Sequence, residues 1–396
     1  MSRLVLTGCK NLQKLLASHS YRCVSNRSFH AIPQMSLNNT QQSPAPSQME
    51  LKEVVQVLED LAPLSLAESW DNVGLLVEPS KPRPVKTILL TNDLTNAVME
   101  EAEAMSCDLL ISYHPPLFQP IKRLVQKDWK QRLAIRAVEA GMAIFSPHTS
   151  WDSVKGGVND WLVGGLGPGQ VSVLSQAYIA LEHTHMVEFK SRTENLDALL
   201  EELTTHFEQD IEVTVQDAHR IDGDYSQVRL HCSGSVLTPV VDKVLQHIIS
   251  CRSLHILKFE KAPRLDHGQG RLSVLSQPVT VSTAVQKMKS HLGLRHVRLA
   301  IGQGRTEESF VHTVAVCAGS GASVLKGIKA DLYVTGEMSH HEVLDAVAKG
   351  TSVILSDHSN SERGYLAVFR KELTQRLPVN VVVMVSKADR DPLVIV

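Results

Sequence analysis

Between residues 50 and 146, stretches in which apolar residues recur every three or four positions alternate with short continuous apolar runs. Leu51, Val54, Val55 and Leu58 recur at the three- and four-residue spacing of a helix, which predicts a helix over 50–61. Downstream, short apolar runs alternate with helical patterns, and the expected elements are strands at 87–90, 109–112 and 143–145 and helices at 97–105 and 132–140. Strands that alternate with helices are typical of a parallel α/β sheet.

The middle of the chain has a different order of elements. Its patterns predict strands at 186–189, 211–215, 228–232 and 254–259 and helices at 196–206 and 237–249. This β-α-β-β-α-β order is that of a ferredoxin-like module, which we interpret as an inserted α+β domain over 184–264.

The α/β pattern resumes in the last third of the chain. The expected helices are 281–292, 339–349 and 363–377, with a further one from 321 to 329, and the expected strands are 297–300, 311–317, 332–334, 353–355 and 379–385. The sequence therefore predicts two α/β halves, 50–183 and 265–396, on either side of the inserted module.

Composition excludes several classes of protein. The 396 residues are 43% hydrophobic and 21% charged, which suits a globular protein, and the net charge of −2 predicts neither a nucleic-acid-binding nor a membrane-binding surface. No apolar run reaches the ~18 residues of a membrane span. The six cysteines are sparse and form no C-x-x-C pair, so we expect no disulfide framework, no cysteine zinc site and a reducing compartment.

Residues 1–49 contain no Asp or Glu and several Arg, Lys and Ser. Their leucines can share one helix face with basic residues opposite, as in a mitochondrial transit peptide. A disordered tail with no addressing function has the same composition, so both interpretations stay open.

Polar residues gather where the predicted strands end. Asp93, His114 and the stretch from His148 to Asp152 each follow a strand of the first half, and ligands bind beyond the carboxyl ends of strands in open α/β sheets. His358 and Glu362 stand four residues apart at the start of a predicted helix and can face one divalent cation. The alternative is a structural role, in which these residues cap helices and hold loops in place through hydrogen bonds.

Three further motifs are less specific. Gly319-Ser320-Gly321 follows a strand, but Val324 breaks the phosphate-binding fingerprint, which favours a tight turn without a ligand. Asp71 is expected to accept hydrogen bonds from backbone donors in a turn. His341 follows Thr335-Gly336-Glu337 and can reach the site or form a surface pair with His340.

Several stretches together resemble the Nif-three-like (GTP cyclohydrolase I type 2) family. The resemblance covers roughly 50–182 and 265–396 and includes the stretches 69–77, 93–95, 111–118, 148–152, 156–162, 268–271, 315–321, 330–337 and 358–362. It implies a two-lobed core with a dinuclear metal site between the lobes. Carried over by position, the ligands are His114, Asp152, His358 and Glu362, with His148 beside the metals.

Two positions depart from the family pattern. Tyr113 stands where the family has the first histidine of a His-His pair, and a neutral phenol is a poorer ligand than imidazole. Asp357 stands where a glycine usually precedes the second-half histidine. We expect two divalent ions, one bound more tightly than the other, and ligands of this kind suit zinc, iron, manganese and nickel about equally.

The resemblance implies two classes of function. One is a metal-dependent hydrolase that acts on a nucleotide or phosphoester, in which His148 or His341 transfers protons. The alternative is a non-enzymatic transcriptional co-regulator of the corepressor type that acts through protein–protein contacts, with structural metals. A metal chaperone or metal-dependent oligomer is a third interpretation. The resemblance further implies a homo-oligomer, dimer or hexamer, in the cytoplasm and nucleus, whereas residues 1–49 indicate mitochondria.

Overall fold

The computed structural model describes residues 49–81, 83–179, 181–207, 210–217, 225–247 and 251–396. The predicted transit peptide or tail lies outside the described residues except for Met49, as do residues 248 and 249 of one predicted helix.

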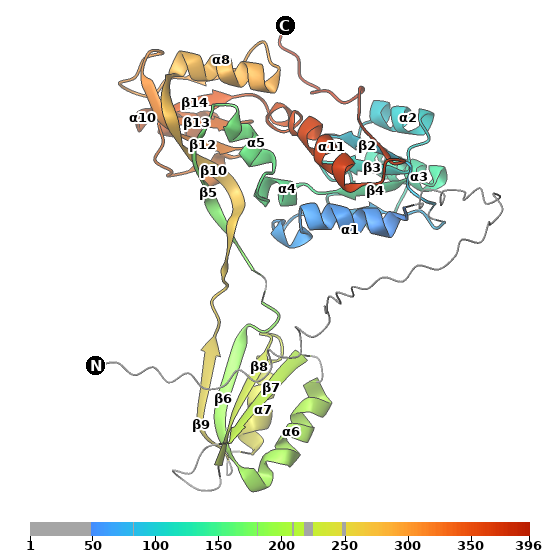
Figure 1. Cartoon of the computed structure of the whole chain (residues 1–396), viewed down its shortest axis with the longest axis vertical. Helices are drawn as coiled ribbons and strands as arrows, with labels where there is room; N and C mark the ends of the chain where they lie inside the picture. Colours follow the sequence, from blue (N-terminus) through green and yellow to red (C-terminus); the bar gives the residue numbers. More distant parts are fainter. Residues whose placement is uncertain (1–48, 82, 180, 208–209, 218–224, 248–250) are drawn as a thin grey trace, which may run out of the picture. The chain divides into compact units, whose positions relative to one another are not determined.

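The first sheet has five strands in the order β1-β4-β3-β2-β15, and its strands β2, β3 and β4 are labelled in Figure 1. Its strands are β1 (Gly74–Val77), β2 (Thr87–Thr91), β3 (Leu109–Ser112), β4 (Ala143–Ser146) and β15 (Val382–Val385). Strands β2, β3, β4 and β15 are parallel to one another, and β1 is antiparallel to β4. The prediction of a parallel α/β sheet is therefore confirmed for this half of the molecule.

Both faces of the first sheet are covered by helices, which explains the continuous apolar runs of its strands. Helices α2 (Asn96–Ala104) and α3 (Trp129–Ala140) pack on the face that carries Leu89 and Leu110. Helices α1 (Leu51–Leu61) and α11 (Tyr365–Arg376) cover the face that carries Ile88 and Ile111. Side chains of a strand alternate between its two faces, so neighbouring residues enter different cores.

The second sheet has six strands in the order β11-β14-β13-β12-β10-β5. They are β5 (Gly169–Tyr178), β10 (Pro263–Thr280), β11 (Arg298–Ala300), β12 (Phe310–Cys317), β13 (Leu332–Thr335) and β14 (Ser352–Leu355). Helices α5 (Val158–Gly164) and α8 (Val281–Leu292) share one core with the first sheet, and α9 (Ala322–Leu325) and α10 (His340–Ala348) cover the other face. One continuous core therefore joins the two sheets.

The two sheets exchange strands. β5 precedes the inserted module in sequence but pairs with β10 at the edge of the second sheet. β15 comes last in sequence but pairs with β2 of the first sheet, and α11 contributes Phe369 and Leu373 to the core beside that sheet. Each sheet is thus completed by a strand from the other end of the chain.

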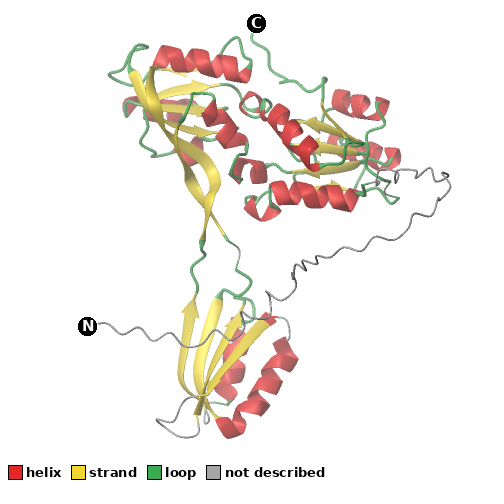
Figure 2. Cartoon of the chain, viewed as in Figure 1, coloured by secondary structure: helices red, strands yellow, loops and turns green. Residues whose placement is uncertain are grey.

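The inserted region has its own sheet, in the order β7-β8-β6-β9, with every neighbouring pair antiparallel. Its elements are β6 (His185–Arg192), α6 (Thr193–Phe207), β7 (Ile211–Asp217), β8 (Tyr225–Cys232), α7 (Leu237–Gln246) and β9 (Cys251–Lys258). Figure 2 shows both helices on one face of this sheet, where a separate core includes Phe189, Leu199 and Val240. The observed element order agrees with the predicted ferredoxin-like order.

Helix ends differ from prediction where capping decides them. The Asp128 side chain accepts hydrogen bonds from the backbone N–H groups of Lys130 and Gln131, so α3 begins at Trp129 rather than at 132. The helix expected to reach residue 329 ends at Leu325. Among the described residues, no helix is long and apolar enough to cross a membrane.

Candidate metal centre

The candidate ligands come together at the carboxyl ends of strands from both sheets. His114 lies two residues after β3. His358 and Glu362 flank the short 3-10 helix η3 (Ser359–Ser361), which follows β14. This corrects the expectation that His358 and Glu362 lie at the start of a helix, because α11 begins only at Tyr365. It is this 3-10 turn, and not the face of an α-helix, that brings the two side chains together.

His114, His358 and Glu362 form a compact cluster. The Nε2 atom of His114 lies 3.5 Å from Glu362 Oε2, and the Nε2 atom of His358 lies 3.4 Å from Glu362 Oε1. One ligand atom from each of the three residues falls within 4.8 Å of the others. Two imidazoles and a carboxylate are ligands that divalent transition metals accept, so the residues fit a metal ion.

The electrostatics of Glu362 support the same conclusion. Its side chain is 2% exposed, and burial, together with the nearby Asp152 carboxyl, raises its pKa well above the usual range. The Asn92 side-chain amide donates a hydrogen bond of 3.1 Å to Oε2, which offsets only part of this cost. A buried carboxylate of this kind is expected where a bound cation compensates the charge.

Each histidine of the site is held by a carboxylate through Nδ1. The Nδ1-to-oxygen distances are 2.9 Å for His114 with Asp93, 2.7 Å for His148 with Asp71, and 2.9 Å for His358 with Glu337. An ionised carboxylate only accepts hydrogen bonds, so Nδ1 carries the proton and the Nε2 lone pair is left for a ligand. This arrangement is that of histidines prepared to bind metal.

Asp93 and Asp71 favour the ionised form. Burial is the largest single influence and by itself raises their pKa values, but the hydrogen bonds and charge of His114 or His148, together with hydrogen bonds from Asn92 or Thr149, outweigh it, and both pKa values are lowered. Asp71 also accepts from the backbone N–H groups of Thr149 and Asn72, which agrees with the predicted turn role. The sequence does not predict the hydrogen bond between Asp71 and His148, because the two residues lie 77 positions apart.

Tyr113 and Asp152 form a second buried pair beside the cluster. The Tyr113 hydroxyl donates a hydrogen bond of 2.7 Å to Asp152 Oδ1. Burial raises the pKa of Asp152 to about 6, although the bond from Tyr113 lowers it in part, and burial also raises the pKa of Tyr113. The phenol therefore binds a carboxyl in the position where the family places an imidazole. Whether Asp152 ligates a metal stays a prediction.

His148 lies close to the cluster in a strained backbone conformation. Its φ of +34° and ψ of −119° are unusual for a residue with a side chain. The ring centroid lies 5.3 Å from that of His114 and 5.6 Å from that of Tyr113. His341, by contrast, is exposed at the start of α10 with its ring beside His340, and it does not line the cavity described below.

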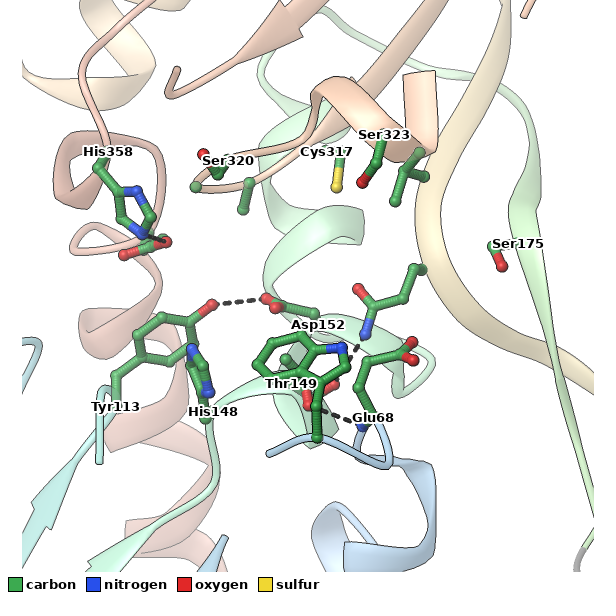
Figure 3. A pocket seen from close by; sticks show the side chains of 16 residues that line it. Glu68, Tyr113, His148, Thr149, Asp152, Ser175, Cys317, Ser320, Ser323 and His358 are labelled. Carbon is green, nitrogen blue, oxygen red and sulfur yellow. Dashed lines mark hydrogen bonds and ion pairs between the residues drawn. The ribbon is translucent and has the colours of Figure 1, made fainter. Parts of the chain in front are cut away.

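A cavity of about 560 Å³ opens beside these residues (Figure 3). Tyr113, His148, Asp152, His358 and Glu362 form part of its wall. Much of the remaining wall is polar or small and includes Glu68, Trp70, Thr149, Ser175, Gln269, Cys317, Gly319, Ser320 and Ser323. A volume of this size accommodates a small molecule of nucleotide dimensions.

The Gly319-Ser320-Gly321 stretch is a tight turn against the cluster. The Gly319 N–H donates to Ser361 Oγ and the Gly321 N–H to Thr335 Oγ1, so these two donors serve the protein itself. A Cβ atom at residue 319 would lie 2.6 Å from Glu362 Oε1. Glycine is therefore required here by close approach to the site, in agreement with the predicted turn.

Comparison with known proteins identifies the family. The sequence profile of Duf34/NIF3 (NGG1p interacting factor 3) matches residues 49–392. This chain belongs to the Duf34/NIF3 family. It is 47% identical over 349 residues to NIF3-like protein 1 of Bos taurus, which covers 87% of this chain and 92% of the bovine protein. Identity to NGG1-interacting factor 3 of Saccharomyces cerevisiae is 30%, over 89% of this chain and 99% of the yeast protein.

Solved structures share the fold of this chain. Staphylococcus aureus protein SA1388 matches with a TM-score of 0.63 and 22% identity, over 89% of this chain and 100% of that chain. Reduced HcgD from Methanocaldococcus jannaschii matches with a TM-score of 0.55 and 18% identity, over 86% of this chain and 98% of that chain. The expected family and the expected α/β fold are both confirmed, although the second sheet combines the parallel pairs β12-β13 and β13-β14 with antiparallel pairs and is not of the predicted parallel type.

Proposed function

We propose that this Duf34/NIF3 protein binds two divalent metal ions and acts as a metal-dependent hydrolase on a nucleotide or phosphoester. The observation that carries the proposal is the cluster of His114, His358 and Glu362, of which His358 and Glu362 line an open cavity. A structural metal site is normally closed by protein ligands, whereas a catalytic one keeps a position open.

The tighter ion is assigned to His114, His358 and Glu362, because their free Nε2 atoms and carboxylate oxygens already converge. The weaker ion is assigned to the side of Glu362 that faces Asp152, where Tyr113 replaces the family's histidine. Burial raises the pKa of Asp152 to about 6, so below that pH protonation of this carboxyl competes with a cation, and the Tyr113 hydroxyl already occupies its Oδ1 atom.

The other side chains of the cavity have separate roles. Bound divalent ions polarise a phosphoryl or carbonyl oxygen and stabilise the charge that develops on it. His148, oriented by Asp71, holds or transfers a proton at Nε2. The hydroxyl groups of Ser320 and Ser323 line the cavity and can orient a polar ligand, whereas that of Thr149 already donates to Asp71 and accepts from the Glu68 N–H.

The first test is metal content per chain, measured by elemental analysis of protein purified without added metal. We expect near-stoichiometric metal in the wild type and its loss in His358→Ala and Glu362→Ala. His312→Ala and Glu308→Ala are matched controls, since both residues are exposed and outside the site. Wild-type protein without metal, and unable to take it up on titration, would remove the basis of the proposal.

A second candidate function is a transcriptional co-regulator that acts through protein–protein contacts, with the metals structural. The name of the yeast relative, NGG1-interacting factor 3, favours it. The variant Glu362→Gln distinguishes the two functions experimentally. A hydrolase loses turnover of nucleotide and phosphoester substrates, whereas a co-regulator retains partner binding as long as the fold is intact. A homo-oligomer, dimer or hexamer, belongs to either proposal.

A further inference from the structure

The loop between β3 and α3, together with the first two residues of α3, carries an unusual exposed surface, which we call the 119–130 loop. All twelve residues from Gln119 to Lys130 are exposed. Four of them are large and apolar, with exposed fractions between 39% and 47%: Ile121, Leu124, Val125 and Trp129. None of these four belongs to a hydrophobic core of the described residues. Exposed apolar residues gathered in one segment mark an interaction site more often than scattered ones do.

The same loop is strongly basic. Lys122, Arg123, Lys127 and Lys130 stand against a single acid, Asp128, whose carboxylate is already used to cap α3. Within the described parts of the chain, Lys122, Arg123 and Lys127 form neither a hydrogen bond nor an ion pair, and Lys130 lies over the Trp129 ring at 5.6 Å. The chain as a whole carries a net charge of −2, so the loop is a local reversal of sign.

The loop is anchored at the mouth of the cavity. The preceding Phe118 contacts Trp70 and His148, with ring centroids 6.0 and 6.3 Å apart. The Asn72 side chain donates a hydrogen bond to the Leu117 carbonyl oxygen. The exposed side chains therefore project from a fixed base and are not part of a free chain end.

We propose that the 119–130 loop is a docking surface for an acidic protein segment in which aliphatic or aromatic side chains alternate with Asp and Glu. The basic side chains require a partner of negative charge, and the four apolar side chains require one that buries hydrocarbon. A phosphodiester backbone satisfies only the first requirement. The proposal depends on neither the metal ions nor the hydrolase activity.

The experiment uses the full chain and a fluorescein-labelled synthetic 20-residue peptide in which Asp and Glu alternate with Leu and Phe. Binding is followed by fluorescence anisotropy at 50 and 300 mM NaCl. A peptide with Lys in place of every acid is the charge control. The test variants are Lys122→Glu/Arg123→Glu/Lys127→Glu and Ile121→Ser/Leu124→Ser. The matched control is Lys329→Glu/Lys349→Glu, since these lysines are also exposed and form no ion pair in the described structure.

We expect the acidic peptide to bind and the lysine peptide not to bind. Charge reversal should weaken binding at least tenfold at 50 mM NaCl and remove most of the salt dependence. The apolar variant should weaken binding about as much at both salt concentrations, and the Lys329/Lys349 control should match the wild type. Circular dichroism of each variant verifies that the fold is retained.

Three results would overturn the proposal. The first is equal binding of acidic and basic peptides, or equal binding by the loop variants and the wild type. The second is preferential binding to vesicles of phosphatidylserine over the acidic peptide, with the same loop dependence, which would indicate a membrane contact. The third is self-association of the wild type in ultracentrifugation that the loop variants abolish while peptide binding is absent, which would indicate a second copy of this chain.

Discussion

Replacing Gly319 by alanine tests the metal centre through a single methyl group. The added Cβ would lie 2.6 Å from Glu362 Oε1 and 3.1 Å from His358 Nε2. To restore an ordinary contact of 3.4 Å, Oε1 has to retreat by 0.8 Å, the difference between 3.4 and 2.6 Å. A binding constellation tolerates displacements of only about 0.5 Å. The methyl group also enters the space that a metal ion bound by Glu362 and His358 would occupy.

The substitution has a second effect that is not specific to the site. Residue 319 has a φ of +60°, so alanine there costs about 1–2 kcal/mol of stability through left-handed backbone strain. Gly327→Ala is a matched control, because its φ is +81° and nothing lies within 4 Å of the added Cβ. Both variants share the cost of backbone strain, so any additional effect of Gly319→Ala isolates the contact of its methyl group with Glu362 and His358.

We expect Gly319→Ala to weaken binding of the tighter metal ion at least tenfold, equivalent to about 1.4 kcal/mol. Gly327→Ala should bind as the wild type does. The assay is isothermal titration calorimetry of metal-free protein with Zn²⁺ or Mn²⁺, next to thermal melts of the same samples. Wild-type affinity in Gly319→Ala, or an equal loss in Gly327→Ala, would refute the assignment of His358 and Glu362 as ligands.

Three further predictions concern the groups around the ligands. Glu337→Gln should weaken metal binding about tenfold in the same titration, at the low end of the usual effect because Glu337 is 49% exposed, while Glu308→Gln should leave it unchanged. Tyr113→His should restore the family's second imidazole, and elemental analysis should then show the weaker ion retained through dialysis; unchanged stoichiometry would contradict the assigned role of Tyr113. The thermal shift produced by metal should be larger at pH 7.5 than at pH 5. Burial raises the folded-state pKa of Asp152 to about 6 and that of Glu362 well above its usual range. The metal-free native state therefore holds protons that the unfolded chain, with a pKa near 4, has released, and its free energy of unfolding falls as pH rises through this window. Metal requires the deprotonated carboxylates and restores that stability at neutral pH. A shift of equal size at both pH values would count against these carboxyls as ligands.

Local sequence patterns determined most of the secondary structure. The strand at 109–112 and the helix at 281–292 have the predicted bounds, because apolar spacing and caps act over a few residues. Local sequence also identifies the candidate ligands His114, His358 and Glu362, because they stand after predicted strands and within short motifs. The chain itself therefore carries enough information to locate these three residues of the candidate metal centre.

Only the tertiary structure decided how that centre is built. The carboxylates that orient its histidines come from 21 to 77 positions away, and no local spacing reveals such pairs. The exchange of β5 and β15 between the sheets, the bond from Tyr113 to Asp152 and the position of His341 away from the cavity likewise depend on long-range packing. The physical reason is that periodicity records which face of an element is buried, whereas the partner across the core is chosen only when the elements pack together.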